Sequence, residues 1–234
     1  IILILIMASI SSLKLVVAET EQTANRAQGA RARIMANMGI AIAANPAIYM
    51  DDPLLKHELD DEGYEVKFSS EAAKFNINYL ILSKDDELLR NIFMEWGMAY
   101  DQANNLIACL QDWVDDNDET TPGGAEIYDY EGMGYKNFPF NRPFYSLSEL
   151  TYVKGWKQVE ELFPEWRSWF TIWSRGKLDL NEAEPKLLAM ACNMEEEYVR
   201  RIRDEVAGYD GILGTSDDAK KNNLDDVLVS LGIP

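Results

Sequence analysis

The sequence predicts an α+β protein in which one long N-terminal helix is followed by a small antiparallel sheet and then by several further helices. Three observations lead to this prediction. An apolar run at the N-terminus continues into an alanine-rich amphipathic segment that ends at Asn45-Pro46. Polar and apolar residues then alternate over two short segments, which is the period of a half-buried strand. Over most of the remaining chain, apolar and aromatic residues recur at intervals of three and four, which is the period of a helix.

The first element is a helix predicted over residues 1–44. Residues 1–18 contain a single charged side chain, Lys14, and such a run suits a bilayer. The run starts without Met or a basic stretch, so we expect it to be the remainder of a longer hydrophobic segment; the C-terminal pattern also stops in mid-course. The unbroken change from apolar to amphipathic resembles the start of a type IV pilin, and a plain membrane anchor with a helical stalk is an equal alternative.

The later elements follow from periodicity and capping residues. Strands are expected where polar and apolar residues alternate, over 65–68 and 75–80. Helices are expected after the polar cap at 83–86, and over 100–114, 147–153, 156–173, 184–191 and 194–205. The many aromatic residues at helical spacing indicate core packing.

An acidic stretch after the helix at 100–114 is the most unusual feature of the chain. Residues 112–126 contain six carboxylates and one amide among turn-forming residues. Like charges at this density repel one another, and such blocks are normally found in disordered tails rather than between aromatic-rich segments. A bound cation would remove the repulsion.

Calcium is the candidate cation, because it takes six to eight oxygen ligands and a loop can turn alternate side chains toward one point. The predicted ligands are the oxygen-bearing residues of this stretch, Asp112, Asp115, Asn117, Glu119 and Glu126. The stretch is not an EF-hand consensus, since the sixth position counted from Asp115 is not glycine. A solvated acidic loop that caps a helix is the alternative interpretation.

A second calcium loop is predicted near the C-terminus, over residues 210–218. Two glycines allow a tight turn whose backbone carbonyls point inward, and three aspartates supply negative charge. The predicted ligands are Asp210, Leu213 through its carbonyl, Asp217 and Asp218. A solvated turn is again the alternative.

Composition excludes several classes of function. With 40 acidic against 22 basic residues, the formal net charge of −18 disfavours nucleic acid and anionic lipid as partners. The hairpin at 192–197 is acidic, which argues against DNA binding by the helix pair around it. The only histidine, His57, is expected in a solvated loop, and no nucleophile elbow, Walker loop or HExxH zinc motif is present. Cys109 and Cys192 could be one disulfide or two thiols.

Taken together, these features resemble the K-type minor pseudopilin of the bacterial type II secretion system over essentially the whole chain. The motifs that carry the resemblance are 112–117 with 124–126, 146–150 with 153–155, and 178–183. The family usually has Asp where Asn117 stands and Asn where Asp179 stands. The first change keeps an oxygen ligand.

The resemblance implies a pilin-like long N-terminal helix with a small antiparallel sheet, interrupted by a large inserted α-helical domain. It implies a transmembrane or pilin helix over 1–44, the first part of the head over 45–83, and an inserted calcium-binding domain over 84–231. The return to the head would be largely missing at the C-terminus. Calcium, as two ions, is the implied cofactor.

The implied function is structural, without catalysis. The protein would start or cap a periplasmic filament that pushes folded proteins through an outer-membrane channel, in a tip complex with the I- and J-type minor pseudopilins. It would cross the inner membrane once, with its head in the periplasm, and would bind neither nucleic acid nor a small-molecule substrate. The alternative is a calcium-dependent extracytoplasmic binding or adhesion module on a membrane stalk. A third hypothesis, a hydrolase with paired carboxylates, is supported only by the abundance of Asp and Glu.

Overall fold

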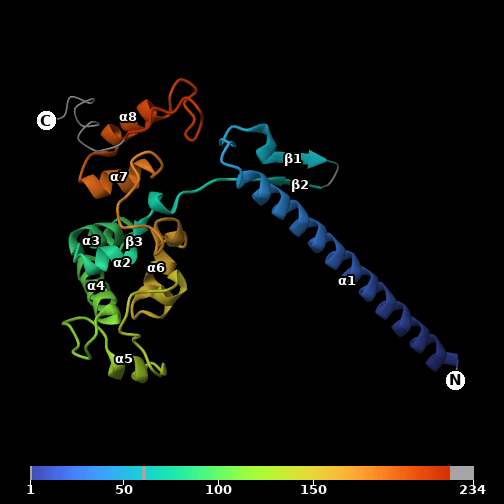
Figure 1. Ribbon diagram of the computed structural model, residues 1–234. Coiled ribbons are helices and arrows are strands. Elements are labelled where there is room, and N and C mark those ends of the chain that lie inside the picture. Colours follow the sequence, from blue (N-terminus) through green and yellow to red (C-terminus); the bar gives the residue numbers. More distant parts are fainter. Residues whose placement is uncertain (1, 60–61, 222–234) are drawn as a thin grey trace. The chain divides into compact units, whose positions relative to one another are not determined.

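The computed structural model describes residues 2–59 and 62–221, and it confirms the α+β class (Figure 1). The chain divides into two compact units. Unit 1 comprises residues up to 68 together with 214–216, and unit 2 comprises residues 69–213 and those from 217 onward. The stretch that contains the expected domain end at 231 lies outside the described residues.

Unit 1 consists of one long helix and a hairpin. Helix α1 runs over Ile2–Ala43, in agreement with the predicted helix over 1–44. A single 3₁₀ turn, η1 (Pro53–Leu55), leads into strands β1 (Lys56–Leu59) and β2 (Glu62–Glu65), which pair antiparallel with Leu59 opposite Glu62. His57, expected in a loop, therefore lies on β1.

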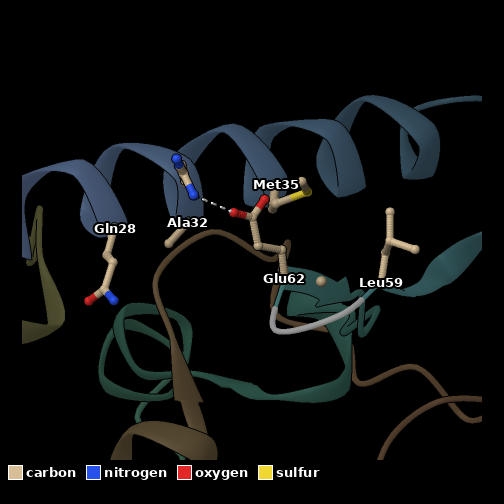
Figure 2. Close-up of a pocket in the computed structure, with 7 residues that line it drawn as sticks. Gln28, Ala32, Met35, Leu59 and Glu62 are labelled. Atoms are coloured by element: carbon tan, nitrogen blue, oxygen red, sulfur yellow. Dashed lines mark hydrogen bonds and ion pairs between the residues drawn. The ribbon is translucent and has the colours of Figure 1, made fainter. Parts of the chain in front are cut away.

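The hairpin packs against the C-terminal half of α1 at a glycine. A Cβ atom at Gly39 would come within 2.9 Å of the Tyr64 ring and of a Val66 methyl carbon, so only glycine allows this approach. An ion pair between Arg31 and Glu62, with nitrogen and oxygen 3.1 Å apart, bridges helix and hairpin at the rim of a shallow hollow (Figure 2). Because both side chains are largely exposed, this pair contributes little to stability.

The N-terminal half of α1 presents apolar side chains to its surroundings. Ile10, Leu13, Leu15, Val16 and Val17 are all exposed. Over residues 2–59 and 62–221, no helix combines the length and apolar character needed to cross a membrane.

Unit 2 is mainly helical. Its α-helices are α2 (Ile77–Leu82), α3 (Asp86–Glu95), α4 (Tyr100–Val114), α5 (Ile127–Gly132), α6 (Trp156–Leu162), α7 (Pro185–Cys192) and α8 (Glu196–Val206). Short 3₁₀ segments lie between them, η2 (Glu71–Ala73), η3 (Leu147–Tyr152) and η4 (Trp166–Ser168). Strands β3 (Phe75–Asn76) and β4 (Phe170–Thr171) form a two-residue parallel pair. The expected helix over 100–114 is confirmed, and Asp85 is the N-cap of α3 within the predicted polar cap.

The core of unit 2 is built from aromatic rings, as their helical spacing predicts. Trp113, Trp156 and Trp166 are fully buried. Trp113 lies 5.3 to 5.8 Å, centroid to centroid, from four other rings, those of Tyr130, Phe138, Phe140 and Phe144. These contacts join the end of α4 to α5 and to the segment over 138–144, so the core fixes the place where the acidic loop begins.

The motif at 178–183 forms a turn that holds a distant segment. The carboxylate of Asp179 accepts a hydrogen bond from the Asn181 backbone N–H at 2.8 Å. The Asn181 amide then pairs with the backbone of Lys221, accepting from its N–H at 2.7 Å and donating to its carbonyl at 3.0 Å. The turn thus ties residue 221 to the start of the helix pair α7 and α8.

The expected pairing of strands over 65–68 and 75–80 is wrong, although Phe75 and Asn76 do form strand β3. Glu65 ends a strand that pairs with residues 56–59, and residues 77–82 form α2. Asn76 caps this helix by accepting a hydrogen bond from the Tyr79 N–H at 3.1 Å. The helical spacing of Ile77, Leu80 and Ile81, all buried, outweighs the short alternation that suggested a strand.

The helix expected over 156–173 is confirmed only to Leu162. Pro164 follows, and Phe163 takes the extended φ of −140° that a residue before proline prefers. The remaining residues form η4 and β4, and β4 pairs with β3. Cys109 is buried, Cys192 is half-buried, and both are free thiols, so no disulfide joins the helices that carry them.

Trp113→Ala should destabilise unit 2 by about 3–5 kcal/mol, because it removes a fully buried ring from an aromatic cluster. Urea unfolding followed by far-UV circular dichroism measures this. Trp173→Ala is the matched control, since the Trp173 side chain is 77% exposed and its loss should cost under about 0.5 kcal/mol. Equal losses from the two variants would contradict the assigned core.

Candidate metal centre

Three carboxylates of the acidic stretch meet where α4 ends and α5 begins. Asp112 lies in the last turn of α4, Asp115 is the C-cap of that helix, and Glu126 is the N-cap of α5. An apolar face with Leu106, Leu110 and Trp113 holds α4 in the core. The position of the first two carboxylates is therefore set by the helix itself.

Asp112 organises the loop that follows. Its fully buried carboxylate accepts hydrogen bonds from the backbone N–H groups of Thr121 (3.1 Å) and Ala125 (2.9 Å). A β-carbon at Gly124 would lie 2.0 Å from an oxygen of Asp112, so glycine is required for this close approach. The loop therefore folds back on α4 and brings Glu126 beside the helix end.

The three carboxylates lie close enough to share one ion. One oxygen from each of Asp112, Asp115 and Glu126 lies within 4.8 Å of the other two. Glu126 is fully buried, and neither of its carboxylate oxygens has a hydrogen-bond partner in the described part of the chain. Burying a carboxylate without a hydrogen-bond partner raises the free energy of the folded state, and a ligand bound to its two oxygens would lower it.

The electrostatics of the site reflect the same crowding. Burial, reinforced by Asp112, Asp115 and Asp118, raises the pKa of Glu126 from 4.5 to about 7. Burial and the neighbouring charges of Asp112 and Asp116 also raise the pKa of Asp115. Without a cation, the folded state therefore retains a proton on Glu126 up to about pH 7.

The donor set fits a hard divalent cation. Calcium binds oxygen at 2.3–2.6 Å, so two ligand oxygens of one ion can be up to about 5 Å apart. Counted from Asp115, Glu126 stands at the twelfth position, where an EF-hand loop has its bidentate Glu. Thr120 replaces the glycine of the sixth position, and Asp112 adds a carboxylate from outside such a loop.

The structure does not bring all the predicted ligands together. Asn117 accepts a hydrogen bond from the Glu119 N–H at 2.7 Å, and Glu119 is exposed and lies outside the group of three. The side-chain amide of Asn141 donates to the Asn117 carbonyl at 3.3 Å and to Asp118 at 3.2 Å. Asn141 therefore supports the loop, and no local signal in the sequence indicates it because it lies 24 residues away.

The predicted loop over 210–218 has a different arrangement. Asp217 accepts hydrogen bonds from the backbone N–H groups of Tyr209 (2.8 Å) and Asp210 (3.3 Å), and Asp210 accepts one from Ile212 at 2.7 Å. Leu213 and Asp218 are half-buried. In residues 2–59 and 62–221, these aspartates do not form a second group of three close carboxylates.

The metal-free protein should lose stability as pH rises. Because the pKa of Glu126 is about 7 in the folded state and near 4.5 when unfolded, its contribution is fully present below about pH 4.5 and lost as pH rises through 7. The loss should be about 3 kcal/mol. Urea unfolding in chelator at pH 5 and pH 8 measures it. Glu126→Gln should remove this loss, whereas the exposed control Glu119→Gln should retain it.

Comparison with known proteins places this site in a recognised family domain. Residues 73–173 match the family model of type II secretion system (T2SS), protein K. The matched segment lies within unit 2 and includes Asp112, Asp115 and Glu126. No curated protein matches the chain.

A solved structure shares the fold. The chain superimposes on a chain of the GspK-GspI-GspJ complex from the type 2 secretion system of enterotoxigenic Escherichia coli, with a TM-score of 0.57 and 15% sequence identity. The match covers 91% of this chain and 76% of that chain. The family match and the shared fold agree with the resemblance drawn from the sequence motifs. The match to the protein K family of the type II secretion system, to which the K-type minor pseudopilins belong, covers residues 73–173 of this chain.

Proposed function

We propose that this chain is a minor pseudopilin that occupies the tip of a type II secretion pseudopilus, where it forms a complex with I- and J-type minor pseudopilins. The observation that carries the proposal is the single 42-residue helix α1, whose apolar side chains over residues 10–17 are exposed in the isolated chain. Contiguous exposed apolar surface marks an interaction site. The similar fold in the GspK-GspI-GspJ complex supports I- and J-type subunits as the partners.

The same helix supports attachment to the bacterial inner membrane, with the remainder of the chain in the periplasm. Residues 1–18 contain Lys14 as their single charged residue, and in a pilin-type subunit such a segment lies in the bilayer before it enters the filament core. The role is structural. Unit 2 serves as a rigid body built on aromatic packing, and the proposal assigns it no reaction.

The domain arrangement supports a position at one end of the filament. We propose that the region over 84–231 is an insertion into a pilin-type head that begins over 45–83. Helical growth needs the same head-to-tail interface on both sides of every subunit. An insertion much larger than the two-stranded sheet of unit 1 would obstruct one side, so the protein would start or cap a filament rather than repeat along it.

Calcium is the proposed cofactor. Asp112, Asp115 and Glu126 would hold the first ion, and the ion would neutralise a buried cluster whose carboxylates otherwise repel. The loop over 210–218 is proposed to hold a second ion with Asp210, the Leu213 carbonyl, Asp217 and Asp218. Support for the second site comes from its sequence pattern, and support for the first comes also from its geometry.

Calcium should raise the melting temperature of the protein at pH 7.5, because an ion bound only to the folded state stabilises it by mass action. Differential scanning calorimetry with calcium and with chelator measures the shift. Glu126→Gln should remove the part of the shift that comes from the first ion without lowering the melting temperature in chelator, since neither Glu126 oxygen makes a hydrogen bond. The exposed neighbour substitution Asp116→Asn should leave the shift intact.

A titration of bound calcium by calorimetry separates one ion from two. Asp217→Asn should reduce the stoichiometry from two to one if the second loop binds. An unchanged melting temperature in the wild-type protein, with or without calcium, would contradict both sites. Magnesium at the same concentration is the control for a purely electrostatic effect.

Affinity purification of the tagged chain from cells that express I- and J-type subunits should recover both in equal amounts. Replacing the exposed pair Val16 and Val17 by Glu should lower recovery at least about tenfold, because it places charge on the apolar helix surface. Glu19→Gln is the control. Recovery of neither subunit would favour a stalked binding module instead, and long filaments made of this chain alone would contradict the capping role.

A further inference from the structure

A connected set of aromatic rings lies in unit 2 over residues 135–152, and in it Phe138 contacts both Tyr135 and Tyr152. Ring centroids are 6.0 Å apart between Tyr152 and Tyr135, 5.4 Å between Tyr135 and Phe138, and 4.8 Å between Phe138 and Phe140. The set continues to Tyr145 through the guanidinium of Arg142. We refer to these rings, Tyr152, Tyr135, Phe138, Phe140 and Tyr145, as the aromatic row.

Most of the aromatic row is exposed. Phe138 packs against the core, but Tyr135, Phe140, Tyr152 and Tyr145 are exposed by 39, 40, 44 and 68%. Core packing therefore covers only part of these rings. Exposed apolar groups that form a contiguous set mark an interaction surface.

The row already holds one cation of the chain. The Arg142 guanidinium carbon lies 3.8 Å from the centroid of Tyr145 and 4.7 Å from that of Phe140, and its Nη1 lies 3.0 Å from a Glu149 oxygen. A planar cation between ring faces, with a carboxylate to balance its charge, is a favourable arrangement. Arg142 occupies one side of these rings and shows that their faces attract a basic side chain.

Uncompensated negative charge adjoins the row. The neighbouring residue Asn141 is hydrogen-bonded to Asp118, and Asp116, Asp118 and Glu119 are all exposed. Residues 115–152 contain eight acidic side chains against two basic ones, and although Glu149 pairs with Arg142 and Asp129 with Lys154, the region stays negative even with a divalent ion bound. This charge repels phosphate and acidic peptides and attracts Lys and Arg.

We propose that the aromatic row and the adjoining acidic loop form a docking surface for a cationic, Arg- or Lys-bearing segment of another protein. The ring faces receive the basic side chains, and the exposed carboxylates balance their charge. The inference rests on contacts within unit 2 alone. It therefore holds or fails independently of the tip position and of the I- and J-type partners.

A fluorescent peptide of alternating arginine and serine is the probe, measured by anisotropy with the full chain at physiological ionic strength. Tyr145→Leu combined with Tyr152→Leu should weaken binding at least about fivefold, because each cation–ring contact at an exposed site contributes about two- to fivefold. Tyr145→Phe combined with Tyr152→Phe retains the rings and should stay within twofold of the wild type.

Exposed tyrosines on α8 and beyond it provide the matched control. Tyr198→Leu combined with Tyr209→Leu changes neither net charge nor the row, and should leave binding within twofold. The proposal would be overturned if the two leucine double variants weakened peptide binding equally, or if neither weakened it. Binding would then depend on net charge alone and not on the rings of the aromatic row. Ring-dependent binding of a chitin oligosaccharide in place of the peptide would overturn the proposal as well. Unchanged circular dichroism spectra show that the variants fold.

Discussion

The buried carboxylate of Asp112 is the contact on which the candidate centre depends. It lies in the last turn of α4 and accepts hydrogen bonds from the backbone of two loop residues, Thr121 and Ala125. Those bonds turn the loop back toward the helix and bring Glu126 next to Asp115. The arrangement then places three carboxylates within reach of one another, which is unfavourable until a cation or protons compensate the charge.

The aromatic core makes this arrangement stable enough to persist. Trp113 directly follows Asp112 and is fixed by four rings from α5 and the segment over 138–144. The core and the acidic loop are therefore neighbours in the chain and in space. Packing energy from the rings can offset the repulsion within the cluster, so a cation would adjust the stability of a folded domain rather than create the fold.

The same segment that completes the core also provides a surface. The Phe138 ring packs against Trp113, whereas the other rings of the aromatic row are exposed. Unit 2 thus combines a rigid interior with an outer face that is aromatic and acidic. An outer face of this chemistry suits recognition of a cationic partner, because ring faces and carboxylates both attract positive charge.

The sequence by itself determined the long helix, the helix over 100–114, the pair α7 and α8, and the acidic stretch that contains the centre. Local periodicity and capping residues are sufficient for these elements, because the signals lie within a few residues of one another. Only the tertiary structure decided that β3 pairs with a two-residue strand after Pro164 and that hairpin β1–β2 precedes residue 66. It also decided which acidic residues meet, Asp112, Asp115 and Glu126 rather than Glu119. Long-range hydrogen bonds such as those of Asn141 and Asn181, and the room left by Gly124, set these outcomes, and such contacts leave no periodic signal in the chain.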